Sequence, residues 1–258
     1  MRFPFVIFSS SIIYCIACTW LASSPILAQP SLIETMQQSM PAIISIAAEE
    51  DELFRSPQGA TIDPKTGRMV VFQKLYKAKK KIFGAGVIVD PSGLIVTNTH
   101  TILNAQKIFV ILNDGTTYPA QVLGVVSQYD FAFLKINPST DLQPITFADS
   151  DKIQLGDEIV TIGNSSLLKE TISGGKIIGI GVQNGEQVQN KEDLKREETK
   201  LIQVDINVYK GDSGGPLFNR NGEFIGLFVA GQIKADRSSF VIPSNKIKEQ
   251  AEKYIQEP

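Results

Sequence analysis

Cysteine and histidine are almost absent from this sequence of 258 residues, which contains two cysteines, Cys15 and Cys18, and a single histidine, His100. Zinc sites built from several His or Cys ligands therefore cannot be assembled, and we expect neither a metal nor a cofactor. An excess of positive charge is also absent, because 25 Lys and Arg stand against 27 Asp and Glu. Without a strong positive field we expect no nucleic-acid binding.

The sequence has enough apolar residues for a complete core. Hydrophobic residues make up 43% of the chain and charged residues 20%. These proportions exclude a disordered or fibrous protein, and the length fits one ordinary domain or two small ones.

The first 28 residues differ from the rest. Arg2 precedes an apolar run over residues 3–21, and Ile26-Leu27-Ala28 places a small residue before Gln29. This layout predicts a secretory signal peptide (1–28) that is cleaved after Ala28, which implies a periplasmic or extracellular protein without cysteine. The alternative is an uncleaved membrane anchor, because residues 3–22 could just span a bilayer. We expect contact with a membrane only in that case.

From residue 84 onward, short apolar runs alternate with turns rich in Gly, Asn and Asp. Parallel α/β sheets would need helices between the strands, so this rhythm predicts an all-β barrel or sandwich. A short helix over 32–40 and a strand over 42–47 come first, and a C-terminal helix over 244–257 comes last. The polar segment 49–81 reads as a long exposed loop with at most one hairpin. The expected strands after it cover residues 86–89, 94–97, 108–112, 118–126, 131–136, 158–162, 175–182, 201–206, 216–218, 223–229 and 239–242.

The strongest chemical motif is Gly211-Asp212-Ser213-Gly214-Gly215. It has the G-x-S-x-G pattern of an exposed nucleophilic serine, in which glycines let backbone N–H groups turn toward a developing oxyanion. The same glycines would also suit an ordinary turn between strands, so the assignment of Ser213 depends on its partners.

A serine hydroxyl needs a base, and His100 is the one imidazole in the chain. It follows an apolar strand, where its side chain can leave the core and face a cleft. A carboxylate shielded from water should orient it, and Asp130 fits best because it opens the apolar segment 131–136. Asp90 and Asp114 lie in turn sequences and are expected to cap local backbone amides instead.

The order of these residues separates the folds that use such a triad. His100, Asp130 and Ser213 occur in the order histidine, acid, serine, as in chymotrypsin. An α/β-hydrolase triad is excluded because the single histidine precedes the serine. The strand rhythm and the order of the triad therefore agree.

The sequence resembles the protease domain of the HtrA/Deg family of trypsin-like serine endopeptidases. The similar stretches occur in the family's order and cover residues 41–45, 84–100, 129–135, 148–164, 211–217 and 240–245. The resemblance implies two six-stranded antiparallel β-barrels with the triad between them. We therefore expect a trypsin-like domain over 29–258, with a first barrel at about 32–147, a second at about 148–243 and the C-terminal helix.

The resemblance also implies the residues around the triad. The backbone amides of Gly211 and Ser213 would form the oxyanion hole. The specificity pocket would be lined by Asn207, Val208, Ala230 and Gly231, and a substrate would pair as an added strand with residues 227–230, which begin at Leu227. No carboxylate lies at the expected base of the pocket, so we predict cleavage after small or medium aliphatic residues rather than after Lys or Arg.

The expected function is a serine endopeptidase that cleaves exported or misfolded polypeptides. Family members usually carry PDZ modules after this domain, but this sequence ends at Pro258, so we expect none. They are often trimers, which makes a homotrimer an expectation from the resemblance. The alternative is a catalytically silent binding or chaperone module of the cell envelope, since a fold alone does not establish an activity.

Overall fold

The computed structural model describes residues 32–163, 171–182, 201–207, 212–229 and 238–255. The chain divides into the units 1–30 and 31–258, and every described residue belongs to the second. The predicted signal peptide lies outside the described residues, so cleavage after Ala28 stays a prediction.

The first sheet has seven strand segments in the order β5-β4-β1-β2-β3-β7-β6. The segments at its two ends, β5 and β6, are separated in the chain only by Ala120. They behave as one bent strand that pairs with β4 on one side and β7 on the other, which closes the sheet. The segments are β1 (Ile43–Ile62), β2 (Met69–Asp90), β3 (Leu94–Asn98), β4 (Lys107–Ile111), β5 (Thr117–Pro119), β6 (Gln121–Val126) and β7 (Phe131–Lys135).

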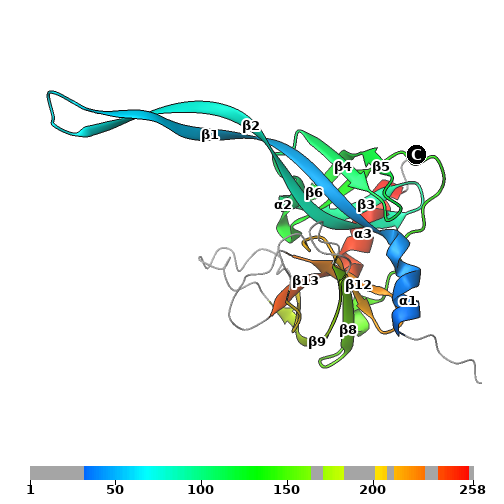
Figure 1. The fold of residues 1–258 in the computed structure, drawn as a ribbon. Coiled ribbons are helices and arrows are strands. Elements are labelled where there is room, and N and C mark those ends of the chain that lie inside the picture. Colours follow the sequence, from blue (N-terminus) through cyan, green and yellow to red (C-terminus); the bar gives the residue numbers. More distant parts are fainter. Residues whose placement is uncertain (1–31, 164–170, 183–200, 208–211, 230–237, 256–258) are drawn as a thin grey trace, which may run out of the picture. The chain divides into compact units, whose positions relative to one another are not determined.

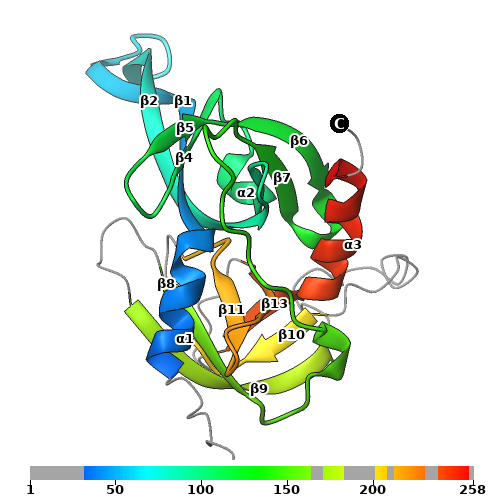
Figure 2. The same ribbon diagram turned by 90° about the vertical axis from the view of Figure 1, so that its right-hand side faces the viewer.

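The second sheet is a closed barrel of six strands in the order β10-β13-β12-β11-β8-β9. All its strand pairs are antiparallel. The strands are β8 (Glu158–Gly163), β9 (Thr171–Val182), β10 (Leu201–Val204), β11 (Pro216–Asn219), β12 (Phe224–Phe228) and β13 (Ser239–Pro243). The predicted all-β class with two barrels and a C-terminal helix is confirmed (Figures 1 and 2).

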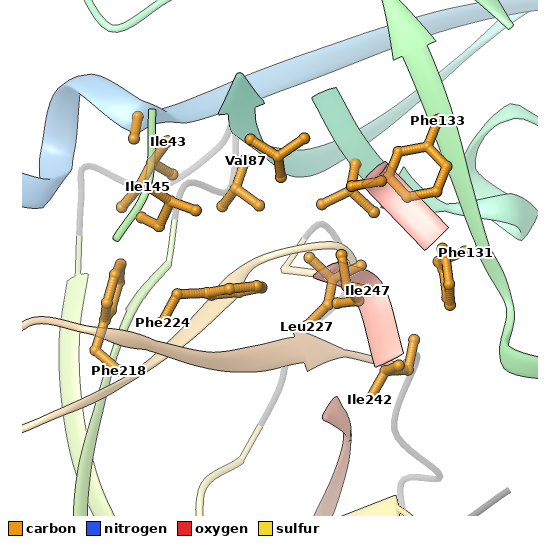
Figure 3. Packing of buried hydrophobic residues seen from close by; sticks show 14 of the residues in the cluster. Ile43, Val87, Phe131, Phe133, Ile145, Phe218, Phe224, Leu227, Ile242 and Ile247 are labelled. Carbon is orange, nitrogen blue, oxygen red and sulfur yellow. The ribbon is translucent and has the colours of Figure 1, made fainter. Parts of the chain in front are cut away.

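The strands β3, β7 and β12 are buried on both faces, because each barrel has an interior and also packs against the other barrel. In β2, Ile88 points into the first barrel, while Val87 belongs to the core that the two barrels share. Figure 3 shows this shared core, where Phe131 and Phe133 of the first barrel lie near Leu227 and Ile242 of the second. Burial on both faces explains why these strands read as continuous apolar runs rather than as alternation.

Two helices link the barrels. Met36 of α1 (Leu32–Ser39) is buried in the shared core, and the Ser39 hydroxyl donates to the carbonyl of Gly222 at 3.1 Å. Helix α3 (Ser244–Ile255) follows the second barrel and places Tyr254 against Phe133, with ring centroids 5.0 Å apart. Among the described residues, no helix is both long and apolar enough to cross a membrane. The short helices are η1 (Met40–Ala42), α2 (Thr99–Ile102), η2 (Ser127–Tyr129) and η3 (Ser150–Lys152).

The exposed segment 49–81, for which the sequence allowed at most one hairpin, forms one long hairpin instead of an irregular loop. Strands β1 and β2 pair without interruption from Ile43 and Val87 to Ile62 and Met69, apart from one bulge. The part beyond the barrel projects as a two-stranded ribbon (Figure 1), which we call the arm and define as residues 50–80. The lysines near its base lie opposite acids of β1, and the Lys80 ammonium is 3.0 Å from the Glu50 carboxylate. Cross-strand pairs of opposite charge favour strand pairing, so this polar sequence can form a hairpin.

Candidate active site

The register of β3 and β7 brings two of the predicted triad residues together. The strands are antiparallel, and Asn98 at the end of β3 pairs with Phe131 at the start of β7. The end of β3 therefore lies beside the start of β7, and the residues just after β3 contact the residue just before β7. His100 lies in the four-residue helix α2, directly after β3, and Asp130 directly precedes β7.

His100 and Asp130 make two hydrogen bonds. The backbone N–H of His100 donates to Oδ1 of Asp130 at 3.1 Å, and the imidazole Nδ1 lies 2.6 Å from Oδ2. Because Nδ1 faces the carboxylate, Nε2 is the ring nitrogen left to accept a proton. The two side chains are 38% and 31% exposed, so Asp130 is shielded from water only in part.

Ser213 lies in a tight turn before β11 of the second barrel. The N–H of Gly215 donates to the carbonyl of Asp212 at 2.9 Å, and Gly214 adopts φ +81. A Cβ on Gly214 would lie 2.2 Å from the carbonyl oxygen of Ala85 in β2. Glycine is therefore required at 214 both by its conformation and by this close approach of two backbones.

Ala85 joins the serine turn to the first barrel. Its N–H donates to the carbonyl of Ser213 at 2.9 Å, and its own carbonyl accepts a hydrogen bond from the buried Thr97 hydroxyl at 2.7 Å. Thr97 lies in β3, three residues before His100. Among the described residues, no hydrogen bond connects the Ser213 hydroxyl with the imidazole.

The two acids assigned to turns cap backbone amides as predicted. Oδ1 of Asp90 accepts from the N–H of Ser92 at 2.9 Å, and Oδ1 of Asp114 accepts from the N–H of Thr116 at 2.8 Å. The backbone bond from Thr116, followed by its side chain, lowers the pKa of Asp114 below its ordinary value. In the part of the chain that the structure describes, the hydrogen bonds of both carboxylates stay within their own turns, and Asp130 is the acid beside the imidazole.

Four residues of the predicted oxyanion hole and specificity pocket lie outside the described residues; they are Val208, Gly211, Ala230 and Gly231. Asn207 is described and exposed. The placement of the pocket therefore stays a prediction.

Leu227 needs a correction. It was expected to pair with a bound substrate, but its backbone is already between two strands, opposite Pro216 of β11 and Ile242 of β13. Its side chain is fully buried in the shared core. A strand with partners on both edges cannot accept a third chain, so Leu227 has a structural role.

Sequence reasoning missed the polar residues at the end of β3. Thr97 and Asn98 are fully buried, and each donates a side-chain hydrogen bond to a backbone carbonyl. The available signal was the run Thr97-Asn98-Thr99, three polar residues directly after an apolar strand and before the single histidine.

Nothing in the described part of the chain groups three or more potential metal ligands. A surface pocket of about 490 Å³ lies on the second barrel, between η3 and the turn from β11 to β12, and it contains no predicted site residue. Two ion pairs lie at its walls, Arg220 with Glu158 at 2.7 Å and Lys152 with Asp149 at 3.1 Å. Their side chains are largely exposed, and ion pairs of this kind contribute little to stability.

Comparison with known proteins agrees with this geometry. A family described as the trypsin-like peptidase domain matches residues 84–227, the segment that contains His100, Asp130 and Ser213. The chain belongs to the trypsin-like peptidase family. Within it, the similarity to curated proteins identifies a protease domain of the HtrA/Deg type.

Three relatives show the extent of this similarity. The periplasmic pH-dependent serine endoprotease DegQ of Escherichia coli is 34% identical over 233 residues, 88% of this chain and 48% of the relative. The periplasmic serine endoprotease DegP of Salmonella typhimurium is 32% identical over 263 residues, 88% of this chain and 52% of the relative. The putative serine protease HhoA of Synechocystis is 30% identical over 240 residues, 88% and 57% respectively. The chain thus spans about half the length of these trypsin-like relatives.

Proposed function

We propose that this protein is a serine endopeptidase in which His100, Asp130 and Ser213 form the catalytic triad. The observation that carries the proposal is the pair of hydrogen bonds between His100 and the Asp130 carboxylate, with Nδ1 only 2.6 Å from Oδ2. This contact fixes the orientation of the ring and directs Nε2 away from the acid.

The reaction is acyl transfer. His100 Nε2 accepts the proton of the Ser213 hydroxyl while Oγ attacks the peptide carbonyl carbon, and the imidazolium then gives that proton to the leaving amine. In the second half of the reaction His100 takes a proton from a water molecule, which attacks the acyl-enzyme, and the imidazolium returns that proton to Ser213 Oγ as the acid product leaves. Asp130 stays ionised and stabilises the imidazolium.

The backbone amides of Gly211 and Ser213 are the proposed oxyanion donors, and loss of one such donor reduces kcat about 10²- to 10³-fold in serine proteases. Asn207, Val208, Ala230 and Gly231 are the proposed lining of the specificity pocket. Small or medium aliphatic residues should precede the cleaved bond. A peptide-library profile dominated by Lys, Arg or Glu at that position would contradict this preference.

The proposed substrates are exported or misfolded polypeptides. Two of the relatives, DegQ and DegP, are described as periplasmic. This supports export of the present chain, with residues 1–28 removed after Ala28. N-terminal sequencing of the protein from a cell envelope tests the cleavage, and an N-terminus at Gln29 is expected. Assembly as a homotrimer remains a prediction that sedimentation velocity would test.

Hydrolysis of an unfolded protein tests the activity directly. The full chain should convert reduced, alkylated casein into peptides, and Ser213→Ala should reduce this rate at least 10³-fold without changing the fold. Ser92→Ala, which removes a serine from an exposed turn, is the matched control and should cleave at the wild-type rate. Equal rates for wild type and Ser213→Ala would refute the proposal.

The missing hydrogen bond between Ser213 and the imidazole favours a second candidate, a latent or catalytically silent protease-fold module. Such bonds are often long in unliganded proteases and shorten when substrate binds. The two candidates differ in one respect: a silent module would bind unfolded casein and suppress its aggregation without releasing any new amino termini.

A further inference from the structure

Asn98 is a buried amide at the end of β3, and it contacts the backbone of Asp130. Its Nδ2 donates to the Asp130 carbonyl at 3.0 Å, and the residue is fully buried. Its Oδ1 meets no hydrogen-bond donor among the described residues. An unsatisfied buried acceptor is unfavourable, so packing alone does not explain an asparagine at this position.

Asp130 has an unusual backbone. It adopts the left-handed conformation, with φ 56 and ψ 40, as the residue that closes η2. Among the described residues, Asn104 is the one other non-glycine residue with positive φ. This conformation is strained for a residue with a Cβ, so surrounding contacts must hold it.

Besides the bond from the Asp130 N–H to the Ser127 carbonyl at 3.3 Å, those contacts come from three consecutive residues. The Asp130 carbonyl accepts from both the Asn98 amide and the Thr99 N–H, each at 3.0 Å. The Asp130 carboxylate accepts from the His100 N–H at 3.1 Å and faces Nδ1 at 2.6 Å. Because the carbonyl and the Cβ belong to one residue, a fixed carbonyl narrows the direction of the Cα–Cβ bond, and the two bonds from His100 then select the rotamer of the carboxylate.

We propose that Asn98 is a positioning residue for the triad, whose side-chain amide holds Asp130 in the left-handed conformation that directs its carboxylate to Nδ1 of His100. The inference rests on the proposed function for its effect on catalysis. The geometry itself does not depend on activity: Asn98 holds Asp130, and Asp130 in turn holds the His100 ring.

The test compares Asn98→Leu, which keeps the approximate shape and removes the donor, with the wild type and with Asn245→Leu. Asn245, at the start of α3, is the control, because its side-chain amide also donates to an aspartate, but the acceptor is the carboxylate of Asp149, away from His100. We expect Asn98→Leu to lower kcat about tenfold to thirtyfold with KM within about twofold, a loss smaller than removal of the acid itself. Asn245→Leu should leave both unchanged.

A double-variant comparison separates positioning from general destabilisation. In an Asp130→Ala background, Asn98→Leu should change the residual kcat less than about twofold, because the group through which it acts is gone. Two losses that multiply would overturn the inference. Asn98→Ala, which removes volume instead of exchanging it, replaces Asn98→Leu if the leucine variant does not fold.

Proton NMR of the single histidine provides a readout that needs no activity. In a preparation without a histidine tag, labelled with ¹⁵N-histidine, every imidazole signal comes from His100. We expect a low-field Nδ1–H resonance that exchanges slowly with water in the wild type and in Asn245→Leu, and faster exchange with an upfield shift in Asn98→Leu. An unchanged resonance in folded Asn98→Leu, or no such resonance in the wild type, would refute the positioning role. A normal resonance pattern in a protein that cleaves nothing would contradict the protease proposal alone.

Discussion

The two halves of the candidate active site are built in different ways. The half from the first barrel, His100 and Asp130, is held by side chains: the carboxylate bonds the histidine twice and Asn98 bonds the backbone of the acid. The half from the second barrel, Ser213, is held by its backbone, through its carbonyl to Ala85 and through the left-handed Gly214.

The difference follows from what each group must do. A base needs one ring orientation and one tautomer, and a neighbouring carboxylate provides both. A nucleophile needs its hydroxyl exposed and nearby amides directed at an oxyanion, and a tight turn with glycines provides both. Substitutions that affect each half separately can test this contrast.

The largest effect is expected in the side-chain half. Asp130→Asn keeps the shape but can place the imidazole in the wrong tautomer, so kcat should fall about 10⁴-fold with little change in stability. Steady-state hydrolysis and urea unfolding measure the two quantities. Asp90→Asn, an acid in a surface turn, is the control. A loss of less than tenfold for Asp130→Asn would contradict the role given to the acid.

The next effect is expected in the backbone half. Gly214→Ala places a Cβ 2.2 Å from the Ala85 carbonyl oxygen at a positive φ, so we expect loss of about 3 kcal/mol of stability together with activity. Gly115→Ala is the control for conformation alone, because Gly115 has φ +86 and no atom within 4 Å of the added Cβ. It should lose only about 1 kcal/mol in urea unfolding. Equal losses at the two positions would mean that the close approach to Ala85 is unimportant.

A smaller effect should appear at the junction of the two halves. Thr97→Val removes the hydroxyl that bonds the Ala85 carbonyl at 2.7 Å, which should cost about 1–2 kcal/mol in stability. Thr97→Ser keeps the hydroxyl and should recover most of that loss. If Ser and Val variants unfold at the same urea concentration, the hydrogen bond contributes nothing to the junction.

The smallest effect lies away from the site, in the second barrel. Asn245, followed by Lys152 and the Asp151 amide, lowers the pKa of Asp149. A carboxyl whose pKa is lowered in the folded state stabilises the fold at pH values above the pKa of the unfolded state, which is 3.8 for this group. That stability is lost as the pH falls through the lower pKa of the folded state. Thermal unfolding of Asp149→Asn should therefore depend less on pH below about pH 4 than that of the wild type. Identical pH profiles would exclude this contribution.

Much of the fold could be predicted from the sequence because buried strands carry a strong apolar signal. Residues 118–126, predicted as one strand, form the bent pair β5 and β6. The sequence allowed a hairpin here but did not show the length or register of the arm. Its acids and lysines are about thirty positions apart, and only pairing shows that Glu50 lies opposite Lys80. Exposed apolar residues on the arm, such as Leu75, also give no periodic signal of burial.

The candidate site was predictable to a different degree in its two halves. The order of His100, Asp130 and Ser213 and the single histidine sufficed to predict the chemistry, because the order of residues is a property of the chain itself. The supporting residues Thr97 and Asn98 were missed because their partners are backbone carbonyls, and a sequence does not show which carbonyl a buried side chain will meet. The assignment of Leu227 failed for a similar reason, since strand pairing on both edges depends on the register of the barrel.

Covalent labelling with a fluorophosphonate tests the central claim most directly, because only an activated serine reacts with this probe at an appreciable rate. The account predicts a single adduct, located by peptide mass spectrometry on Ser213, and loss of labelling in both Ser213→Ala and His100→Ala. Labelling of another residue, or labelling of Ser213 that is unchanged in His100→Ala, would contradict a nucleophile activated by this histidine.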